Sequence, residues 1–219
     1  MTSPQRIGGF PVAYETLQFG EHRVELAMIP DLESHLDRDR LLSDSSYEPP
    51  YWALVWSGAQ LFLPGFLERH SLVGTHLLDV GCGLGVVSLA AAAAGARVTA
   101  VDRAKTALGF LAESTTRNGF EIEAQPIDLA SLRPELRFDH VIGAELLYER
   151  ESFSELASEL MSRLAPEGRL TIVDAHRVDT RPFYRALAEL GARRVFSDRM
   201  EVREERTLVR IDVTEFLGA

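Results

Sequence analysis

The stretch HLLDVGCGLGVVSLAAAAAGARVTAVD, residues 76–102, decides the fold. A short apolar run enters a loop with three glycines, a long apolar segment leads to Gly95, and a second apolar run ends in Asp102. This order predicts a strand, a glycine loop, a helix and a second strand that ends in an acid. Glycines let the backbone turn sharply and approach a ligand, and the free N–H groups of the next helix face that ligand. Because such ligands lie beyond the carboxyl ends of the strands, Asp102 is placed to accept hydrogen bonds from a ribose.

The spacing of the glycines indicates which nucleotide is bound. The dinucleotide fingerprint needs glycine or alanine three residues after Gly83, where Val86 stands. Asp79 instead lies two residues ahead of a G-x-G-x-G run, which resembles motif I of the class I (seven-strand) S-adenosylmethionine-dependent methyltransferases. The resemblance implies S-adenosyl-L-methionine as the cofactor, with Asp102 on the ribose and Asp128 at the adenine amino group. The simpler alternative is that the glycines form only a structural turn. The cofactor site is assigned to Asp79, Gly81, Gly83, Gly85, Asp102, Arg103, Asp128 and Leu129.

Length and composition favour one soluble globular domain. The chain has 219 residues, enough for a full core, of which 46% are apolar and 26% charged. Its net charge of −10 argues against a nucleic-acid or anionic membrane partner, since both require basic patches, and suits a cationic target better. The single cysteine, Cys82, is expected to be a small filler in the glycine loop, and a chain without an internal disulfide suits the cytoplasm. We see no signal peptide and no apolar run of membrane-spanning length.

The first sixty residues are predicted to form an extension that precedes the catalytic core of residues 61–219. Residues 13–19 and 24–29 alternate like the two strands of a hairpin. Residues 31–44 are charged and carry a sparse helical stripe. Because we find no repeat and no composition shift that marks a second domain, we expect a single methyltransferase domain over residues 1–219.

Residues 49–58, PPYWALVWSG, hold both tryptophans of the chain and are called here the proline–tryptophan segment. The adjacent prolines exclude a regular helix at that point, after which Ser57 is expected to cap a helix towards Arg69 that Pro64 kinks or splits. A proline pair followed by tyrosine also occurs in enzymes that methylate amino groups of DNA, but there it follows a buried strand. No such strand precedes it here, and the acidic net charge weighs further against DNA.

The alternation of helices and strands continues beyond Asp102. One helix ends at Asn118-Gly119, a C-cap pattern, a capping box at residues 152–155 opens another, and a third stops at Gly191. The remaining predicted strands lie at residues 122–127, 138–144, 170–173, 194–197 and 207–213. Because no helix joins the last two strands, they must be antiparallel. The sequence therefore predicts an α/β fold with a doubly wound, mainly parallel, seven-stranded Rossmann-like sheet, a terminal antiparallel strand and an N-terminal hairpin and helix extension.

Two further motifs narrow the resemblance. Glu145-Leu-Leu-Tyr148 looks like the acid-x-x-aromatic motif after the fourth strand of family-16 protein lysine methyltransferases, and the proline–tryptophan segment resembles the one that those proteins carry before motif I. The likeness covers most of residues 48–175 and is closest in appearance to the electron-transfer-flavoprotein lysine methyltransferases. It departs from them at Glu145, where aspartate is more usual, and at Ser57, where proline is usual. The family implies that Trp56 borders the cofactor and that Glu145 and Tyr148 border the target amine.

The chemistry of methyl transfer favours the same residues. The acceptor must lie in line behind the methyl group, and an amine must arrive uncharged, so a carboxylate that takes its proton helps. Glu145, at the carboxyl end of a central strand, is placed to meet the acceptor or the methionine part of the cofactor. The aromatic faces of Trp52, Trp56 and Tyr148 are candidates to attract a sulfonium or an amine. The lone His176 shares no metal-ligand spacing with other histidines, so we assign it no role and expect no metal.

The sequence thus predicts an S-adenosylmethionine-dependent methyltransferase that N-methylates a lysine side chain of a protein. A small-molecule N- or O-methyltransferase stays open, because a fold does not determine a substrate. A non-catalytic S-adenosylmethionine-binding protein is opposed by the intact glycine loop, and a nicotinamide dehydrogenase by Val86 and by the lack of an evident tyrosine-lysine pair. The mouth of the site discriminates between acceptors. A protein needs an open approach between residues 45–60 and the loop after Tyr148, whereas a small molecule favours a closed lid.

Overall fold

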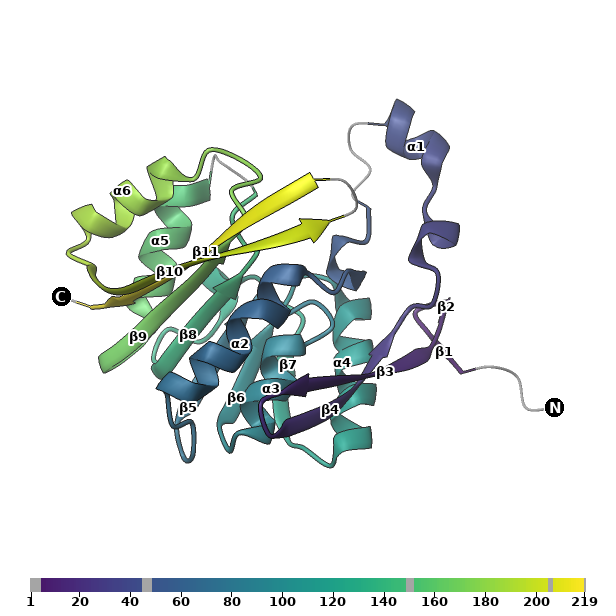
Figure 1. Ribbon diagram of the computed structural model, residues 1–219, viewed down its shortest axis with the longest axis horizontal. Coiled ribbons are helices and arrows are strands. Elements are labelled where there is room, and N and C mark those ends of the chain that lie inside the picture. The colour runs from purple at the N-terminus through teal and green to yellow at the C-terminus, as the bar shows by residue number, and fades with distance from the viewer. Residues whose placement is uncertain (1–4, 45–48, 149–151, 205–206, 219) are drawn as a thin grey trace.

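The computed structural model describes residues 5–44, 49–148, 152–204 and 207–218, and its centre is a seven-stranded sheet (Figure 1). The strands of this sheet are β5 (His76–Val80), β6 (Arg97–Val101), β7 (Ile122–Gln125), β8 (Phe138–Ala144), β9 (Leu164–Asp174), β10 (Arg193–Glu204) and β11 (Thr207–Leu217). They lie in the order β10-β11-β9-β8-β5-β6-β7. Strands β5 to β9 are parallel, whereas β11 pairs antiparallel with both β9 and β10. This arrangement confirms the predicted, mainly parallel sheet with an antiparallel strand near its end.

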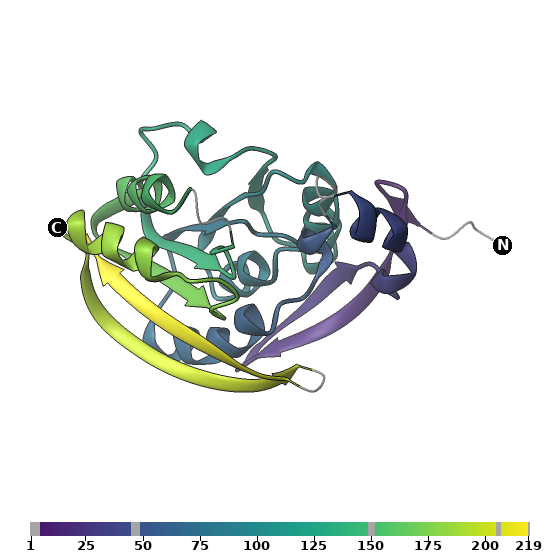
Figure 2. The same ribbon diagram turned by 90° about the horizontal axis from the view of Figure 1, so that it is seen from above.

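Helices cover both faces of the sheet, which confirms a doubly wound fold (Figures 1 and 2). The helices are α2 (Ser57–Arg69), α3 (Val86–Ala93), α4 (Lys105–Asn118), α5 (Phe153–Ser162) and α6 (Arg181–Glu189). On one face α2, α3 and α4 share an apolar cluster, and on the other face α5 and α6 share a second one. Successive strand residues serve the two clusters in turn: Leu77 of β5 belongs to the first and Leu78 to the second. Because both faces are covered, the central strands are nearly continuous apolar runs.

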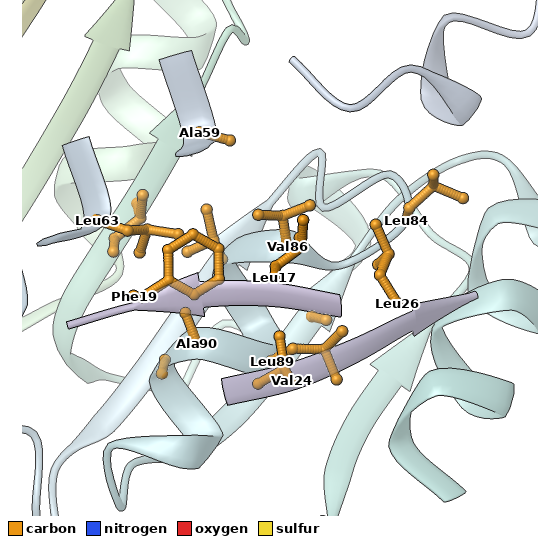
Figure 3. Close-up of a cluster of buried hydrophobic side chains, with 14 of the residues drawn as sticks. Leu17, Phe19, Val24, Leu26, Ala59, Leu63, Leu84, Val86, Leu89 and Ala90 are labelled. Atoms are coloured by element: carbon orange, nitrogen blue, oxygen red, sulfur yellow. The ribbon is translucent and has the colours of Figure 1, made fainter. Parts of the chain in front are cut away.

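The N-terminal extension contains the predicted hairpin, β3 (Ala13–Phe19) and β4 (His22–Met28). Its apolar side chains pack against α2 and α3, as Figure 3 shows. The side chains that meet there include Leu17, Phe19, Val24 and Leu26 of the hairpin and Ala59, Leu63, Val86, Leu89 and Ala90 of the helices. The amide of Ala27 also donates a hydrogen bond of 2.8 Å to Oγ of Ser114 in α4. The hairpin therefore shares the core of the first face.

Two predictions of helix starts are corrected by the structure. Ser57 does not cap α2: it is the first helical residue, Trp56 holds the N-cap position, and no side-chain capping hydrogen bond forms. The helix also runs through Pro64 without being split, because buried side chains on both sides of the proline hold it on the sheet. Ser152 stands before α5 with φ −96° and ψ 0°, and its side chain makes no capping hydrogen bond, since capping requires an extended backbone at that position.

The last two strands are longer than predicted. β10 and β11 extend over residues 193–204 and 207–217, whereas the sequence suggested 194–197 and 207–213. β11 pairs with β9 as far as Asp212 opposite Asp174, and beyond that point β10 and β11 pair with each other as a long curved hairpin (Figure 2). Along this hairpin charged residues alternate with half-buried apolar ones, so it contains no long apolar run.

The remaining elements are short. Residues 31–44 hold a 3-10 turn and one short helix rather than a continuous stripe. Residue 48, where the resemblance to lysine methyltransferases begins, lies outside the described residues. The short elements are β1 (Arg6–Ile7), β2 (Phe10–Pro11), α1 (Arg38–Ser43) and the 3-10 turns Leu32–His35, Tyr51–Ala53 and Leu129–Ser131. In the part of the chain that the structure describes, no helix has the length and apolar character needed to cross a membrane.

Candidate functional site

A cavity of about 750 Å³ lies at the carboxyl ends of β5, β6, β8 and β9. The chain leaves β5 for β6 on one side and later returns to β8 on the other. The cavity therefore occupies the switch point at which open α/β sheets bind their ligands. It brings together most of the residues that the sequence singled out. The predicted residues in its wall are Trp52, Trp56, Asp79, Gly81, Gly83, Asp102, Arg103, Glu145 and Tyr148.

A smaller cavity of about 300 Å³ shares part of its wall with the first, including Asp102 and Arg103. Asp128, which was predicted to contact adenine, and Leu129, which was assigned to the cofactor site, line this smaller cavity. Gly85 lines neither cavity, although it was assigned to the cofactor site. It is the N-cap of α3 with a φ of +87°, and an added Cβ there would overlap Cδ1 of Leu111, so backbone angle and packing both call for this glycine.

The glycine loop is open because no side chain can occupy it. Gly81 and Gly83 have φ values of +66° and +52°, which L-residues with side chains rarely adopt. A Cβ at Gly83 would lie 2.9 Å from the carbonyl oxygen of Trp52, so the loop and the proline–tryptophan segment touch through their backbones. The amide of Gly81 donates to the carbonyl of Val101 at 2.9 Å, which holds the loop at the end of β6. The result is a backbone cradle that suits the close approach of a nucleotide cofactor.

Two acids hold this loop in different ways. Oδ2 of the buried Asp79 accepts hydrogen bonds from the amide and the hydroxyl of Ser88, at 3.0 and 2.6 Å. Burial raises the pKa of Asp79 to about 7, against the lowering effect of Ser88. Asp102 accepts from the amide of Gly83 at 2.9 Å and from that of Ala104 at 2.8 Å. Each carboxylate oxygen has two lone pairs, so Asp102 can accept further hydrogen bonds from a ribose.

Arg103 connects the two cavities. Its Nε lies 3.7 Å from Oδ1 of Asp128, and its Nη2 donates a hydrogen bond of 3.2 Å to the hydroxyl of Tyr148. Arg103, Asp128 and Tyr148 are all at least half exposed, so these contacts are screened by solvent. The residue predicted for the adenine end and the one predicted for the acceptor end are thus joined through one side chain.

Glu145 is the buried acid of the site. It follows β8 with a φ of +55°, and its side chain is only 4% exposed. A Cβ on Gly58 would lie 2.5 Å from Oε1 of Glu145, so the carboxylate packs directly against this glycine. Burial raises the pKa of Glu145, the charge of Arg177 lowers it, and the charges of Glu204 and Asp174 raise it. Oε1 is buried against Gly58, and it has no hydrogen-bond partner among the described residues.

Arg177 is a charged residue of the cavity wall that was not singled out from the sequence. Its Nε lies 3.5 Å from Oε2 of Glu145, and its guanidinium carbon lies 4.7 Å from the centre of the Trp56 ring. Its Nη2 donates to both carboxylate oxygens of Glu204 at 3.3 Å. One clue was available, since Arg177 follows the fifth predicted strand by four residues and so belongs to the same sheet edge. Its partner Glu204 gave no such clue, because it lies on the unpredicted part of the hairpin.

His176 and Cys82 were also discussed from the sequence. The ring of His176 lies between acids, with Nδ1 3.0 Å from Oδ2 of Asp174 and Nε2 3.0 Å from Oδ2 of Asp212. Asp174 lines the main cavity, although the sequence analysis did not single it out. Burial and neighbouring acids raise the pKa of the Cys82 thiol, which favours its interpretation as a filler over that of a nucleophile. Among the described residues, no group of three or more His, Cys, Asp or Glu could hold a metal ion.

Comparisons with known proteins point to one family. A family model described as "Methyltransferase small domain" matches residues 52–199. The protein N-lysine methyltransferase METTL21A of Danio rerio is 34% identical over 118 residues, which cover 49% of this chain and 53% of that protein. The ubiquinone biosynthesis O-methyltransferase of Pseudomonas putida strain W619 is 32% identical over 127 residues, or 57% and 53% of the two chains. The chain thus spans about half the length of the curated relatives that it matches.

Solved structures share the fold at lower sequence identity. The N-methyltransferase NodS of Bradyrhizobium japonicum WM9 aligns with a TM-score of 0.62 and 20% identity over 75% of this chain and 99% of that chain. The 16S rRNA N2 G1207 methyltransferase RsmC of T. thermophilus aligns with a TM-score of 0.67 and 18% identity over 95% of this chain and 51% of that chain. At these identities the likeness concerns the fold alone, and the sheet is that of the seven-strand class.

Proposed function

Because this chain belongs to the methyltransferase small domain family, whose cofactor is S-adenosyl-L-methionine, we propose that it transfers a methyl group to a lysine side chain of a protein. The domain is that of an S-adenosylmethionine-dependent methyltransferase, and the acceptor is the part that we infer. One observation carries the inference: the buried carboxylate of Glu145 lines the same cavity as the ring of Trp56. A carboxylate and an aromatic face together suit a cationic amine.

The residues at the cofactor end fit this cofactor. When bound, S-adenosyl-L-methionine supplies a methyl group that its positively charged sulfur activates for transfer. Asp102 would accept hydrogen bonds from the ribose, since its oxygens keep lone pairs beside the open loop of Gly81 and Gly83. Asp79 would hold the start of α3 through Ser88, and Trp56 would border the cofactor. The residues that would hold the adenine end are those of the smaller cavity, Arg103, Asp128 and Leu129.

Glu145 would take a proton from the acceptor. A lysine ammonium must lose a proton before its nitrogen lone pair can attack, and the carboxylate of Glu145 can receive it. Because burial raises the pKa of Glu145, this carboxylate is a stronger base than a surface glutamate. The same burial keeps water away from the nitrogen, and Tyr148 at the mouth would help to orient the acceptor chain.

The mouth of the cavity favours a protein acceptor. Tyr51 and Tyr148 line the cavity and are 55% and 51% exposed, and Leu54 beside them is exposed as well. Apolar side chains that are half open to solvent offer a surface on which a polypeptide can lie. The net charge of −10 suits a partner that presents a lysine and opposes an RNA acceptor, since RNA binding requires positive charge. The N-lysine methyltransferase among the relatives supports the same proposal.

A small molecule is the second candidate. The ubiquinone biosynthesis O-methyltransferase matches this chain at nearly the same identity as the lysine enzyme does. Glu145 could take a proton from a hydroxyl group as readily as from an amine. The acceptor side of the site therefore needs a direct test.

The test is to incubate the purified protein with methyl-labelled S-adenosyl-L-methionine and a heat-treated lysate, and to count label separately in protein, RNA and low-mass fractions. We expect label in one or a few protein bands that release methyl-lysine on hydrolysis, and no such label with the Glu145→Gln variant. Label in the low-mass or RNA fraction alone would contradict a protein acceptor.

A further inference from the structure

Arg177 places a positive charge at the acceptor end of the cavity. Its guanidinium lies between the carboxylate of Glu145, 3.5 Å away, and the ring of Trp56, whose centre is 4.7 Å away. A buried carboxylate beside an aromatic face is also the environment that an alkylammonium group seeks. Arg177 thus occupies the surroundings that suit the proposed acceptor.

The contacts of Arg177 are loose compared with those of other arginines in this chain. Arg199 holds Asp212 through two hydrogen bonds of 2.6 and 2.8 Å, and Arg181 holds Asp179 through two of 2.7 Å. Arg177 meets Glu145 at 3.5 Å and Glu204 at 3.3 Å, distances at the outer limit of hydrogen bonding. Its side chain is 38% exposed, so water can solvate it when it moves. Little free energy therefore holds the guanidinium at Glu145.

Arg177 also has a second partner to move towards. Glu204 lies at the end of β10, on the hairpin beyond the last pair with β9, and already accepts from Nη2 of Arg177. The guanidinium can shift towards Glu204 and keep an ionic partner throughout. If Arg177 moved away with nothing in its place, Glu145 would be left as an uncompensated buried charge, which is strongly unfavourable. An incoming cation that replaces Arg177 removes this cost.

We propose that Arg177 is a built-in competitor of the acceptor: it pairs with Glu145 until a cationic side chain enters, then moves to Glu204 and leaves Glu145 to the acceptor. The proposal rests on the proposed function, because it assumes an amine as the acceptor. It makes Arg177 a residue that sets specificity, since a neutral ligand gains nothing from displacing it. The displacement also favours proton transfer, because the charge of Arg177 lowers the pKa of Glu145 and that effect weakens as the guanidinium leaves.

The test measures binding of n-butylammonium, which has the charge and length of a lysine side chain, by calorimetric titration near pH 8 in saturating S-adenosylhomocysteine. We expect Arg177→Met to bind this probe at least about fivefold more tightly than the unchanged chain, because the internal competitor is gone. Glu204→Gln should bind it about twofold more weakly, because Arg177 then stays on Glu145. The matched control is Arg181→Met, which removes an exposed arginine outside the cavity and should leave the affinity unchanged.

Opposite shifts in the two variants separate this role from a structural one. If Arg177 only fastened the hairpin, Arg177→Met and Glu204→Gln would both loosen the site and shift the affinity in the same direction, which would overturn the proposal. Equal or weaker binding by Arg177→Met, or binding that persists in Glu145→Gln, would also overturn it. Label found only in low-mass products together with the expected shifts would reject the protein acceptor and keep the role of Arg177. Methyl-lysine label with an unchanged affinity in Arg177→Met would support the protein acceptor and reject the role of Arg177.

Discussion

The two ends of the cavity differ in whether backbone or side-chain groups form their walls. The cofactor end is made of backbone: Gly81 and Gly83 with positive φ, and amides held by Asp102, all within a short stretch of chain. The proposed acceptor end is made of side chains from distant segments, with Glu145 and Arg177 meeting beside Trp56. Backbone geometry tolerates little change, whereas an ion pair between side chains can exchange partners.

The largest effect is expected from a change that breaks the acceptor end alone. Glu145→Gln removes the base and should lower kcat about 100- to 10,000-fold, because general base catalysis contributes that much. Cofactor affinity should stay within about twofold, since the glycine loop and Asp102 are unaffected. Methyl transfer to the labelled acceptor and calorimetric titration of the cofactor measure the two quantities. Glu145→Asp, which keeps a carboxylate, should retain part of the activity, and full activity of Glu145→Gln would remove Glu145 from catalysis.

The next effect concerns stability at the cofactor end. Asp79 has an ordinary pKa of 3.8 and a pKa of about 7 in the folded chain, so between these values the folded chain binds the proton more tightly than the unfolded chain does. The free energy of unfolding should therefore fall as pH rises from about 4 to about 7, by an amount on the order of 4 kcal/mol.

Asp79→Asn keeps an oxygen for Ser88 but cannot titrate, so it should lose that slope and be more stable than the unchanged chain near pH 8. Urea unfolding at several pH values measures the difference. Asp198→Asn on the exposed hairpin is the control and should keep the slope of the unchanged chain. Parallel slopes for Asp79→Asn and the unchanged chain would show that Asp79 is ionised in the fold.

A smaller effect is expected at the ribose position. Asp102→Ala should weaken cofactor binding about tenfold or more, or about 1.4 kcal/mol, because charge-assisted hydrogen bonds to the ribose are lost. Calorimetric titration measures it, with the thermal unfolding midpoint recorded because Asp102 also holds the amides of Gly83 and Ala104. Asp128→Ala, which removes a largely exposed acid, should weaken binding less. An unchanged affinity in Asp102→Ala would remove it from the cofactor site.

The smallest effect is expected from the contact between Tyr148 and Arg103, which joins the two ends of the cavity. Tyr148→Phe deletes the hydroxyl that accepts from Arg103, an exposed hydrogen bond, and should lower kcat/KM about two- to threefold. Cofactor affinity and kcat/KM should be measured on the same samples. If affinity falls as much as kcat/KM does, Tyr148 serves the cofactor end through Arg103. If only kcat/KM falls, Tyr148 serves the acceptor.

Most of the residues singled out from the sequence line the main cavity, but one of its charged residues, Arg177, was not among them. The pattern of Asp79 and the glycines identifies the loop because each glycine reports a backbone angle, and Glu145 is recognisable because it directly follows a buried strand. Ser57 was assigned to the wrong side of a helix start, since capping depends on an extended backbone that residue type alone does not reveal. Arg177 was missed because its partner Glu204 lies on a hairpin whose alternating charges hide its length.

The sequence by itself determined the features that depend on neighbouring residues: the alternation of strands and helices, the doubly wound sheet, the glycine loop and the acid at the end of β6. Periodicity and glycine content are local properties, and they control local backbone geometry directly. Only the tertiary structure decided that Glu145 is buried against Gly58. It also decided that Arg177 contacts Glu145, the ring of Trp56 and the carboxylate of Glu204. Burial and ionic pairing depend on which distant segments meet, and the packing of the whole sheet and its helices sets that meeting.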